Sequence, residues 1–155
     1  MRDLRNGYML VTGGAGLIGS TLIWELNRRG LKNILVTDRL GKSEKWKNLA
    51  PLRFEDYLEA GELERRLACA KTAHGGIHTV FHLGACSATT ETDASYLIRN
   101  NYEYTKMLAE WSLTHGARFL YASSAATYGG LEENLSEDRP LHTLRPLNMY
   151  GYSKH

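Results

Sequence analysis

The 155-residue sequence predicts an α/β fold with a doubly wound parallel sheet. Short apolar runs alternate with longer amphipathic stretches along the chain, and the apolar runs are almost uninterrupted. Uninterrupted apolar strands are typical of a parallel sheet that is buried on both faces, and right-handed crossovers then wind that sheet in both directions. Hydrophobic residues make up 43% and charged residues 23% of the chain, which are globular values that argue against a disordered protein.

The elements follow from local patterns. Tyr8–Thr12 (YMLVT) stops at Gly13 and predicts a buried strand. Leu17–Arg29 carries apolar residues at helical spacing and is closed by Gly30. The polar stretch 131–147 predicts a loop. Further strands are predicted over Asn33–Thr37, Leu52–Phe54, Thr79–Leu83 and Arg118–Ala122, and further helices over Glu62–Ala70, Ala94–Leu113 and Met149–Lys154.

Composition limits the classes of partner. Nineteen basic and seventeen acidic residues leave a net charge of +2, too balanced to indicate nucleic-acid binding. Two cysteines, Cys69 and Cys86, cannot make a disulfide framework and fit a reducing compartment. The amino terminus is polar, with no apolar run long enough for a signal peptide or a membrane span. We therefore expect a cytoplasmic protein without a nucleic-acid or membrane partner.

A glycine-rich loop follows the first predicted strand. Gly13, Gly16 and Gly19 stand three residues apart, between the strand and a helix. Such glycines permit a tight turn, a close approach of the main chain to a pyrophosphate, and close packing of helix on strand. The positive end of the helix dipole then faces the phosphates. Because the second strand leads to Asp38, the context is that of a Rossmann-type dinucleotide fingerprint.

The residues after the second strand bear on the choice of cofactor. Asp38 is expected to reach the adenosine ribose, where an acidic residue favours NAD by repelling a 2′-phosphate. Arg39 follows directly, and Lys42 and Lys45 lie in the next loop. Charge-assisted hydrogen bonds from these side chains can hold a 2′-phosphate, although the two lysines can equally be solvated loop residues. Taken together, these charges favour NADP as the cofactor, and NAD stays an alternative.

A second constellation lies near the end of the chain. Tyr150 and Lys154 are four residues apart, so a helix places both on one face. An adjacent ammonium lowers the pKa of a phenol and makes it a usable acid and base. Ser123 and Ser124 follow a predicted strand, at the edge of the sheet where ligands bind. Ser124 can donate to the substrate oxygen on which Tyr150 acts.

Two competing readings are weaker. A serine nucleophile at Ser123 or Ser124 lacks the G-x-S-x-G surroundings and a histidine base. His74, His78 and His82 are spaced four apart, but Gly75 and Gly76 interrupt any helix and His82 lies in a predicted strand. One face therefore cannot collect the three imidazoles, and no metal is expected.

Four longer runs carry a family resemblance: HLGACSATTE (82–91), NNY (100–102), LYASSAATYGG (120–130) and PLNMYGYSK (146–154). The glycine loop, Ser124 and the Tyr150/Lys154 pair resemble the extended short-chain dehydrogenase/reductase superfamily of NAD(P)-dependent nucleotide-sugar epimerases and dehydratases. Within it, the four runs resemble the ADP-L-glycero-D-manno-heptose 6-epimerase family. The resemblance covers the chain beyond about its first seven residues.

The resemblance implies a function and a set of roles. Members of that family invert C6 of an ADP-heptose by transient oxidation with bound NADP, for the lipopolysaccharide inner core, and are oligomeric. Tyr150 is implied as proton acceptor, with Lys154 beside it and Ser124 as its substrate-binding neighbour. Cofactor contacts are implied for Leu17, Ile18, Asp38, Arg39, Lys45, Leu83, Gly84, Ala85, Cys86, Ser87, Asn100 and Lys154. Departures from the family pattern at Arg39, Ala60 and Leu83 leave NAD open.

The chain stops at His155, soon after its last predicted helix begins. The family's substrate domain and a second acid/base lysine lie further along, so we expect residues 1–155 to be a truncated dinucleotide-binding domain that binds cofactor only. The alternatives are a UDP-hexose 4-epimerase or a dehydratase of the same superfamily, and a non-catalytic nucleotide-binding remnant. Dehydratases usually carry an acidic pair after the active-site serine, where this chain has Ala125 and Ala126.

Overall fold

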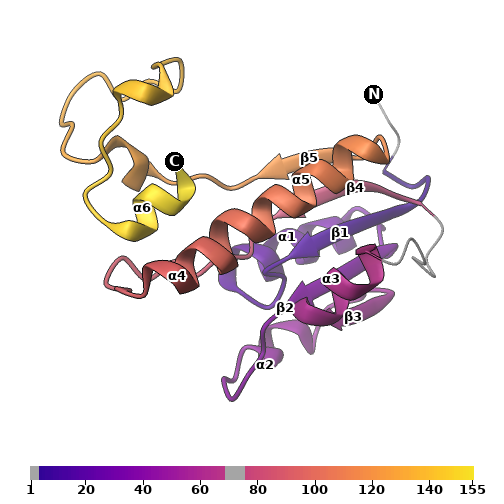
Figure 1. Cartoon of the computed structure of the whole chain (residues 1–155). Helices are drawn as coiled ribbons and strands as arrows, with labels where there is room; N and C mark the ends of the chain where they lie inside the picture. The colour runs from indigo at the N-terminus through magenta and orange to yellow at the C-terminus, as the bar shows by residue number, and fades with distance from the viewer. Residues whose placement is uncertain (1–3, 69–75) are drawn as a thin grey trace. The chain divides into compact units, whose positions relative to one another are not determined.

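The computed structural model describes residues 4–68 and 76–155 (Figure 1). The chain forms two compact units. The first runs to Gly84 and also includes Ala109–Tyr121, whereas the second comprises Ala85–Leu108 and Ala122–His155.

The first unit is built on a five-stranded parallel sheet of order β3-β2-β1-β4-β5. Its strands are β1 (Tyr8–Thr12), β2 (Ile34–Asp38), β3 (Asp56–Glu59), β4 (Ile77–His82) and β5 (Arg118–Tyr121). In central β1, Val11 pairs with Val36 of β2 on one side and with Phe81 of β4 on the other. This order confirms the predicted doubly wound sheet and brings the carboxyl ends of all five strands to one edge.

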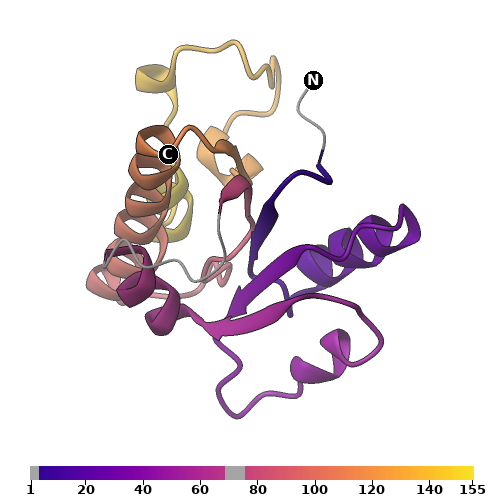
Figure 2. The same ribbon diagram turned by 90° about the vertical axis from the view of Figure 1, so that its right-hand side faces the viewer.

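Helices cover both faces of this sheet. Figure 2 shows α1 (Leu17–Arg28) on one side of the strands and α3 (Ala60–Ala68) on the other. Ile23 of α1 belongs to the same buried cluster as Met9 and Val36. Because both faces are covered, the inner strands are apolar along almost their whole length.

The α3 helix shows why its sequence folds as it does. Leu63 and Leu67 are four residues apart, lie on one face, and are 1% and 5% exposed. Burying each leucine contributes roughly 1.5–3 kcal/mol, more than the modest helix propensity of so short a segment. A further short helix, α2 (Trp46–Leu49), lies between β2 and β3.

The second unit is mainly helical. Its elements are α4 (Ala94–Leu97), the π-helix η1 (Ile98–Glu103), the first residues of α5 (Tyr104–Thr114), the 3₁₀ helices η2 (Ala125–Tyr128) and η3 (Leu141–Thr143), and α6 (Met149–Lys154). α6 packs against α4, η1 and η2. The stretch 131–147 is a loop apart from η3, as predicted.

Three predicted elements need correction. The strand expected over Leu52–Phe54 is wrong, because those residues follow the turn that closes α2, and the third strand is Asp56–Glu59. That strand buries only Leu58 fully, so it lacks the continuous apolar run that marks the inner strands. The helix expected over Ala94–Leu113 contains the π-helical turns of η1. The helix expected over Glu62–Ala70 begins at Ala60, and its last two residues lie outside the described part of the chain.

Among the helices of residues 4–68 and 76–155, none combines the length and the apolar character that a membrane crossing requires.

Candidate functional site

The glycine loop turns tightly between β1 and α1. Gly13 has φ +67°, a left-handed conformation, and a Cβ on it would lie 2.7 Å from the Cα of Gly84. A Cβ on Gly19 would overlap the carbonyl oxygen of Gly13, so α1 can approach the loop only because residue 19 is glycine. The first and third glycines therefore have the packing roles that the sequence predicts for them.

The amino end of α1 can receive an anion. Gly16 is its N-cap residue and supplies no side-chain cap, so the first amide groups of the helix are not neutralised by a side chain of the N-cap. No acidic residue lies in the first turn. Leu17 and Ile18, at the start of the helix, are 82% and 68% exposed. Uncapped amides and a favourable helix dipole fit a dinucleotide pyrophosphate.

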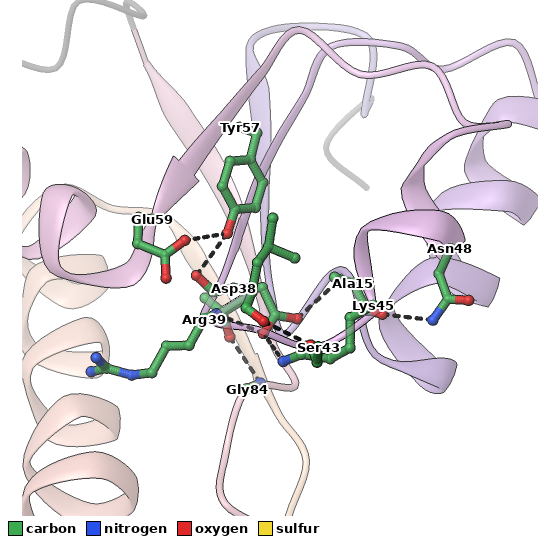
Figure 3. A network of polar contacts seen from close by, with 11 residues as sticks. Ala15, Asp38, Arg39, Ser43, Lys45, Asn48, Tyr57, Glu59 and Gly84 are labelled. Carbon is green, nitrogen blue, oxygen red and sulfur yellow. Dashed lines mark hydrogen bonds and ion pairs between the residues drawn. The ribbon is translucent and has the colours of Figure 1, made fainter.

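Asp38 ties this loop to the end of β2 (Figure 3). Its Oδ2 accepts the backbone N–H of Ala15 at 2.9 Å, and its Oδ1 accepts the ammonium of Lys45 and the N–H of Arg39, each at 2.7 Å. The Asn48 amide donates to the Ala15 carbonyl at 2.8 Å. Both peptide groups of Ala15 are thus held by side chains from β2 and α2, which fix the loop.

Thr12 connects the glycine loop to the end of β4. Its hydroxyl oxygen accepts the N–H groups of Leu83 and Gly84 at 3.2 and 3.0 Å and lies 2.6 Å from Nδ1 of His82. Because that oxygen accepts from two amides, its proton is directed to the histidine. The buried His82 ring also stacks on Phe119 of β5. Two residues expected at the cofactor, Leu83 and Gly84, are therefore fixed against the loop.

The histidine spacing has a structural outcome. His78 and His82 both lie on β4, while His74 lies outside the described residues. The described residues contain no group of three side chains that could ligate a metal ion.

In the second unit, α6 carries Tyr150 and Lys154. The helix begins at Met149, with Asn148 as its N-cap accepting the N–H of Gly151 at 2.8 Å. Lys154 is 8% exposed and donates from Nζ to the carbonyl of Ala122 at 2.9 Å. Burial lowers the pKa of Lys154 to about 8. The lysine is thus a fixed charge in a poorly hydrated place, one helical turn from the phenol.

Ser124 lies close to α6 because η2 and α6 pack together at Gly151. It is the N-cap of η2, where its hydroxyl oxygen accepts the Ala126 N–H at 3.2 Å and its own proton stays available to a ligand. A Cβ on Gly151 would lie 2.7 Å from the carbonyl oxygen of Ala126, so α6 packs closely on η2. The helix with Tyr150 and the turn with Ser124 are therefore neighbours, as the predicted catalytic set requires.

Asn101 is a buried polar residue that sequence reasoning missed. Its side-chain NH₂ donates to the Cys86 carbonyl at 3.0 Å and to the Ser153 hydroxyl at 2.9 Å, while its Oδ1 accepts the Cys86 N–H at 2.9 Å. Asn100, an expected cofactor contact, donates to the same Oδ1 at 3.0 Å. Asn101 lies in the π-helix η1, and π-helical turns are frequent at functional sites.

A second glycine contact closes the loop after η2. Gly129 has φ +66°, and a Cβ there would overlap the carbonyl oxygen of Arg145. The two ends of the intervening segment are therefore in direct contact.

The predicted residues fall into two groups, one in each unit. The group in the first unit is Gly13, Gly16, Leu17, Ile18, Gly19, Asp38, Arg39, Lys45, Leu83 and Gly84. The group in the second unit is Ala85, Cys86, Ser87, Asn100, Ser124, Tyr150 and Lys154.

Comparison with known proteins decides the family. Residues 9–155 match the sequence profile of the NAD dependent epimerase/dehydratase family. The chain belongs to this family.

The family's curated members include close relatives of this chain. It is 46% identical over 149 residues to the ADP-L-glycero-D-manno-heptose-6-epimerase of Fusobacterium nucleatum, and 49% identical over 150 residues to that of Nitratidesulfovibrio vulgaris. Each alignment covers 94% of this chain and 45% of the relative. The chain thus spans somewhat less than half the length of these curated relatives.

Solved structures of the family agree with the fold. The ADP-L-glycero-D-manno-heptose-6-epimerase of Helicobacter pylori superposes with a TM-score of 0.80 at 27% identity, over 99% of this chain and 50% of that one. The Bacillus cereus UDP-glucuronic acid 4-epimerase in complex with NAD gives 0.76 at 26% identity, over 95% and 48% of the two chains. A Rossmann-type fold is therefore common to the chain and to these epimerases.

Proposed function

We propose that the chain is the dinucleotide-binding part of an ADP-L-glycero-D-manno-heptose 6-epimerase and that it binds NADP. The supporting observation is the 46–49% identity over 94% of the chain to curated enzymes of that name. The fixed glycine loop and the uncapped amino end of α1 support dinucleotide binding independently of any relative. The low cysteine count supports a cytoplasmic location. Homo-oligomerisation of the full-length enzyme and a small-molecule nucleotide-sugar partner belong to the same proposal.

In the proposed reaction Tyr150 handles the proton. A nicotinamide held at the glycine loop would supply a hydride acceptor and donor for C6, so the overall change would be redox-neutral. Tyr150, as phenolate, takes the C6 hydroxyl proton as the ketone forms, and the second acid/base, which lies further along the full-length enzyme, serves the opposite face. The Lys154 ammonium favours the phenolate, since an opposite charge lowers a phenol's pKa. Ser124 donates its hydroxyl proton to the same substrate oxygen and orients it.

The choice of NADP over NAD is supported by the charges beyond β2. Arg39, Lys42 and Lys45 place three cations in the segment after that strand. Asp38, which would repel a 2′-phosphate, is already paired with Lys45 at 2.7 Å. The repulsion that favours NAD is therefore weakened in this chain.

Cofactor titration tests the proposal directly. Calorimetric titration of the chain with NADP and with NAD should show binding of both and tighter binding of NADP. The matched variant is Gly16→Asp, which places a carboxylate at the anion-binding end of α1 and should weaken both cofactors at least tenfold. Unchanged affinity in this variant would contradict binding at the glycine loop.

A second measurement addresses the sugar. Because the curated relatives are about twice as long, we propose that residues 1–155 alone turn over ADP-D-glycero-D-manno-heptose little or not at all when NADP is present. Turnover at an ordinary enzymatic rate would contradict this. Thermal-shift measurements on the full-length enzyme with the ADP-heptose, UDP-glucose and UDP-glucuronic acid distinguish a heptose epimerase from a UDP-hexose epimerase or dehydratase, and a response to the dinucleotide but to none of the three sugars would favour a non-catalytic nucleotide-binding remnant.

A further inference from the structure

The carboxylate of Asp38 is occupied by the protein itself. It accepts the Ala15 N–H, the Arg39 N–H and the Lys45 ammonium, and only 9% of its side chain is exposed. A carboxylate has about four lone-pair sites, so three of them are used. A ribose hydroxyl is left with about one site, on a side chain that is almost fully buried. Asp38 is therefore placed to hold the glycine loop rather than to read the ribose.

The next residue, Arg39, is better placed to distinguish NADP from NAD. A guanidinium nitrogen of Arg39 lies 3.6 Å from a carboxylate oxygen of Glu64, which belongs to α3. The two side chains are 55% and 44% exposed, so the pair is weak and open to exchange. A phosphate dianion can replace the carboxylate with two parallel charge-assisted hydrogen bonds. An arginine beside the acidic residue at the end of the second strand is where a 2′-phosphate is accommodated.

Another carboxylate near the end of the second strand has a partner of its own. The other carboxylate at the end of β3, Glu59, accepts the hydroxyl proton of Tyr57 at 2.6 Å, and that hydroxyl also lies 3.0 Å from the Asp38 carbonyl oxygen (Figure 3). Glu59 is thus engaged with a tyrosine that packs onto the end of β2. Glu64 is the acidic side chain of α3 that contacts Arg39.

We propose that Glu64 is a specificity-determining residue, which holds the Arg39 guanidinium until a 2′-phosphate replaces it. The selection between NADP and NAD is then made by the Arg39–Glu64 pair and not by Asp38. Glu64 competes with the 2′-phosphate and so limits the preference for NADP. This inference rests on the proposed dinucleotide binding.

Calorimetric titration of variants with NADP and NAD tests it. Glu64→Gln should tighten NADP binding about two- to fivefold, the range in which exposed ion pairs fall, and leave NAD unchanged. The matched control is Glu62→Gln, which makes the same charge change on the same helix, where Glu62 pairs with Arg65 and Arg66. This control should move neither affinity by as much as twofold.

Two further variants separate the possible selectors. In an Arg39→Met background, Glu64→Gln should have no effect on either cofactor. Asp38→Asn should weaken NADP and NAD by the same factor, because it loosens the loop through Ala15. A selective gain for NADP in Asp38→Asn, or equal effects of Glu64→Gln and Glu62→Gln, would overturn the inference. A wild-type chain that binds neither cofactor would overturn the proposed function itself.

Discussion

The ammonium of Lys154 donates a hydrogen bond to the carbonyl of Ala122, 2.9 Å away, from a residue that is 8% exposed. Burial lowers the pKa of Lys154 to about 8. A lysine with this pKa is still charged at neutral pH, which the proposed stabilisation of a Tyr150 phenolate requires. It also makes the stability of the fold depend on alkaline pH in a particular direction.

The free energy of unfolding of the wild type should rise with pH relative to that of a variant without the Lys154 charge. Below about pH 8, Lys154 is protonated in both states, so the folded chain bears the cost of burying the ammonium. Between about pH 8 and the ordinary value of 10.5, only the unfolded chain keeps the proton, and that cost disappears. Urea unfolding of wild type and Lys154→Met at pH 7 and pH 10 should show the difference shifting in favour of wild type. A constant difference would contradict the lowered pKa.

Two glycine-to-alanine substitutions should have opposite effects. Gly19→Ala puts a methyl group on the carbonyl oxygen of Gly13 and should cost about 2 kcal/mol or more of unfolding free energy, with loss of cofactor binding. Gly61→Ala is the matched control, because it lies in α3 with no atom within 4 Å of its Cβ position. It should gain about 0.5–1 kcal/mol from helix propensity. Chemical denaturation of both variants provides the comparison.

Removing the Thr12 hydroxyl should be costly in the folded chain. Thr12→Val keeps the shape but leaves the Leu83 and Gly84 amides and Nδ1 of His82 without that partner. We expect a loss of about 2–3 kcal/mol in unfolding free energy and weaker cofactor binding. Thr12→Ser retains the hydroxyl and should restore most of both. Equal losses in the two variants would instead assign the effect to the missing methyl group.

Asn101 should control the exposure of the Cys86 thiol. Asn101→Leu removes both backbone contacts of Cys86 and should cost about 3 kcal/mol, because it leaves buried polar groups unpaired. In a Cys69→Ser background, alkylation of Cys86 should then be faster. Ser153→Ala cuts the other contact of Asn101 and leaves those to Cys86 in place. Its alkylation rate should stay close to wild type, and a matching increase would contradict separate roles.

The inner strands, the edge strand β5 and the helices beside them could be predicted because each had a local signal. β1 coincides with its predicted range, and β2, β4 and β5 deviate at their ends by one or two residues. The edge strand β3 could not be predicted, because the sequence from Asp56 to Glu59 has no apolar run. Its pairing with β2 is a tertiary contact. The π-helical turns of η1 could not be predicted either, because the periodicity of the sequence over Ala94–Leu113 indicates only a regular helix.

The candidate site was predictable in its residue types and not in its partners. Glycine spacing indicated the loop, and the Tyr150–Lys154 spacing indicated one helical face. The occupation of Asp38 by Ala15 and Lys45 arises from a strand, a loop and a short helix that meet in space. Local sequence rules indicate the chemistry that a side chain can perform. The fold decides which of its donors and acceptors are already bonded to other groups of the protein.

The contact between Gly129 and the Arg145 carbonyl has a consequence for divergence among related enzymes. A segment whose two ends are in contact can change in length or composition at a small entropic cost, because its ends stay in place. Changes between Gly129 and Arg145 should therefore leave the packing of α6 against η2 in place.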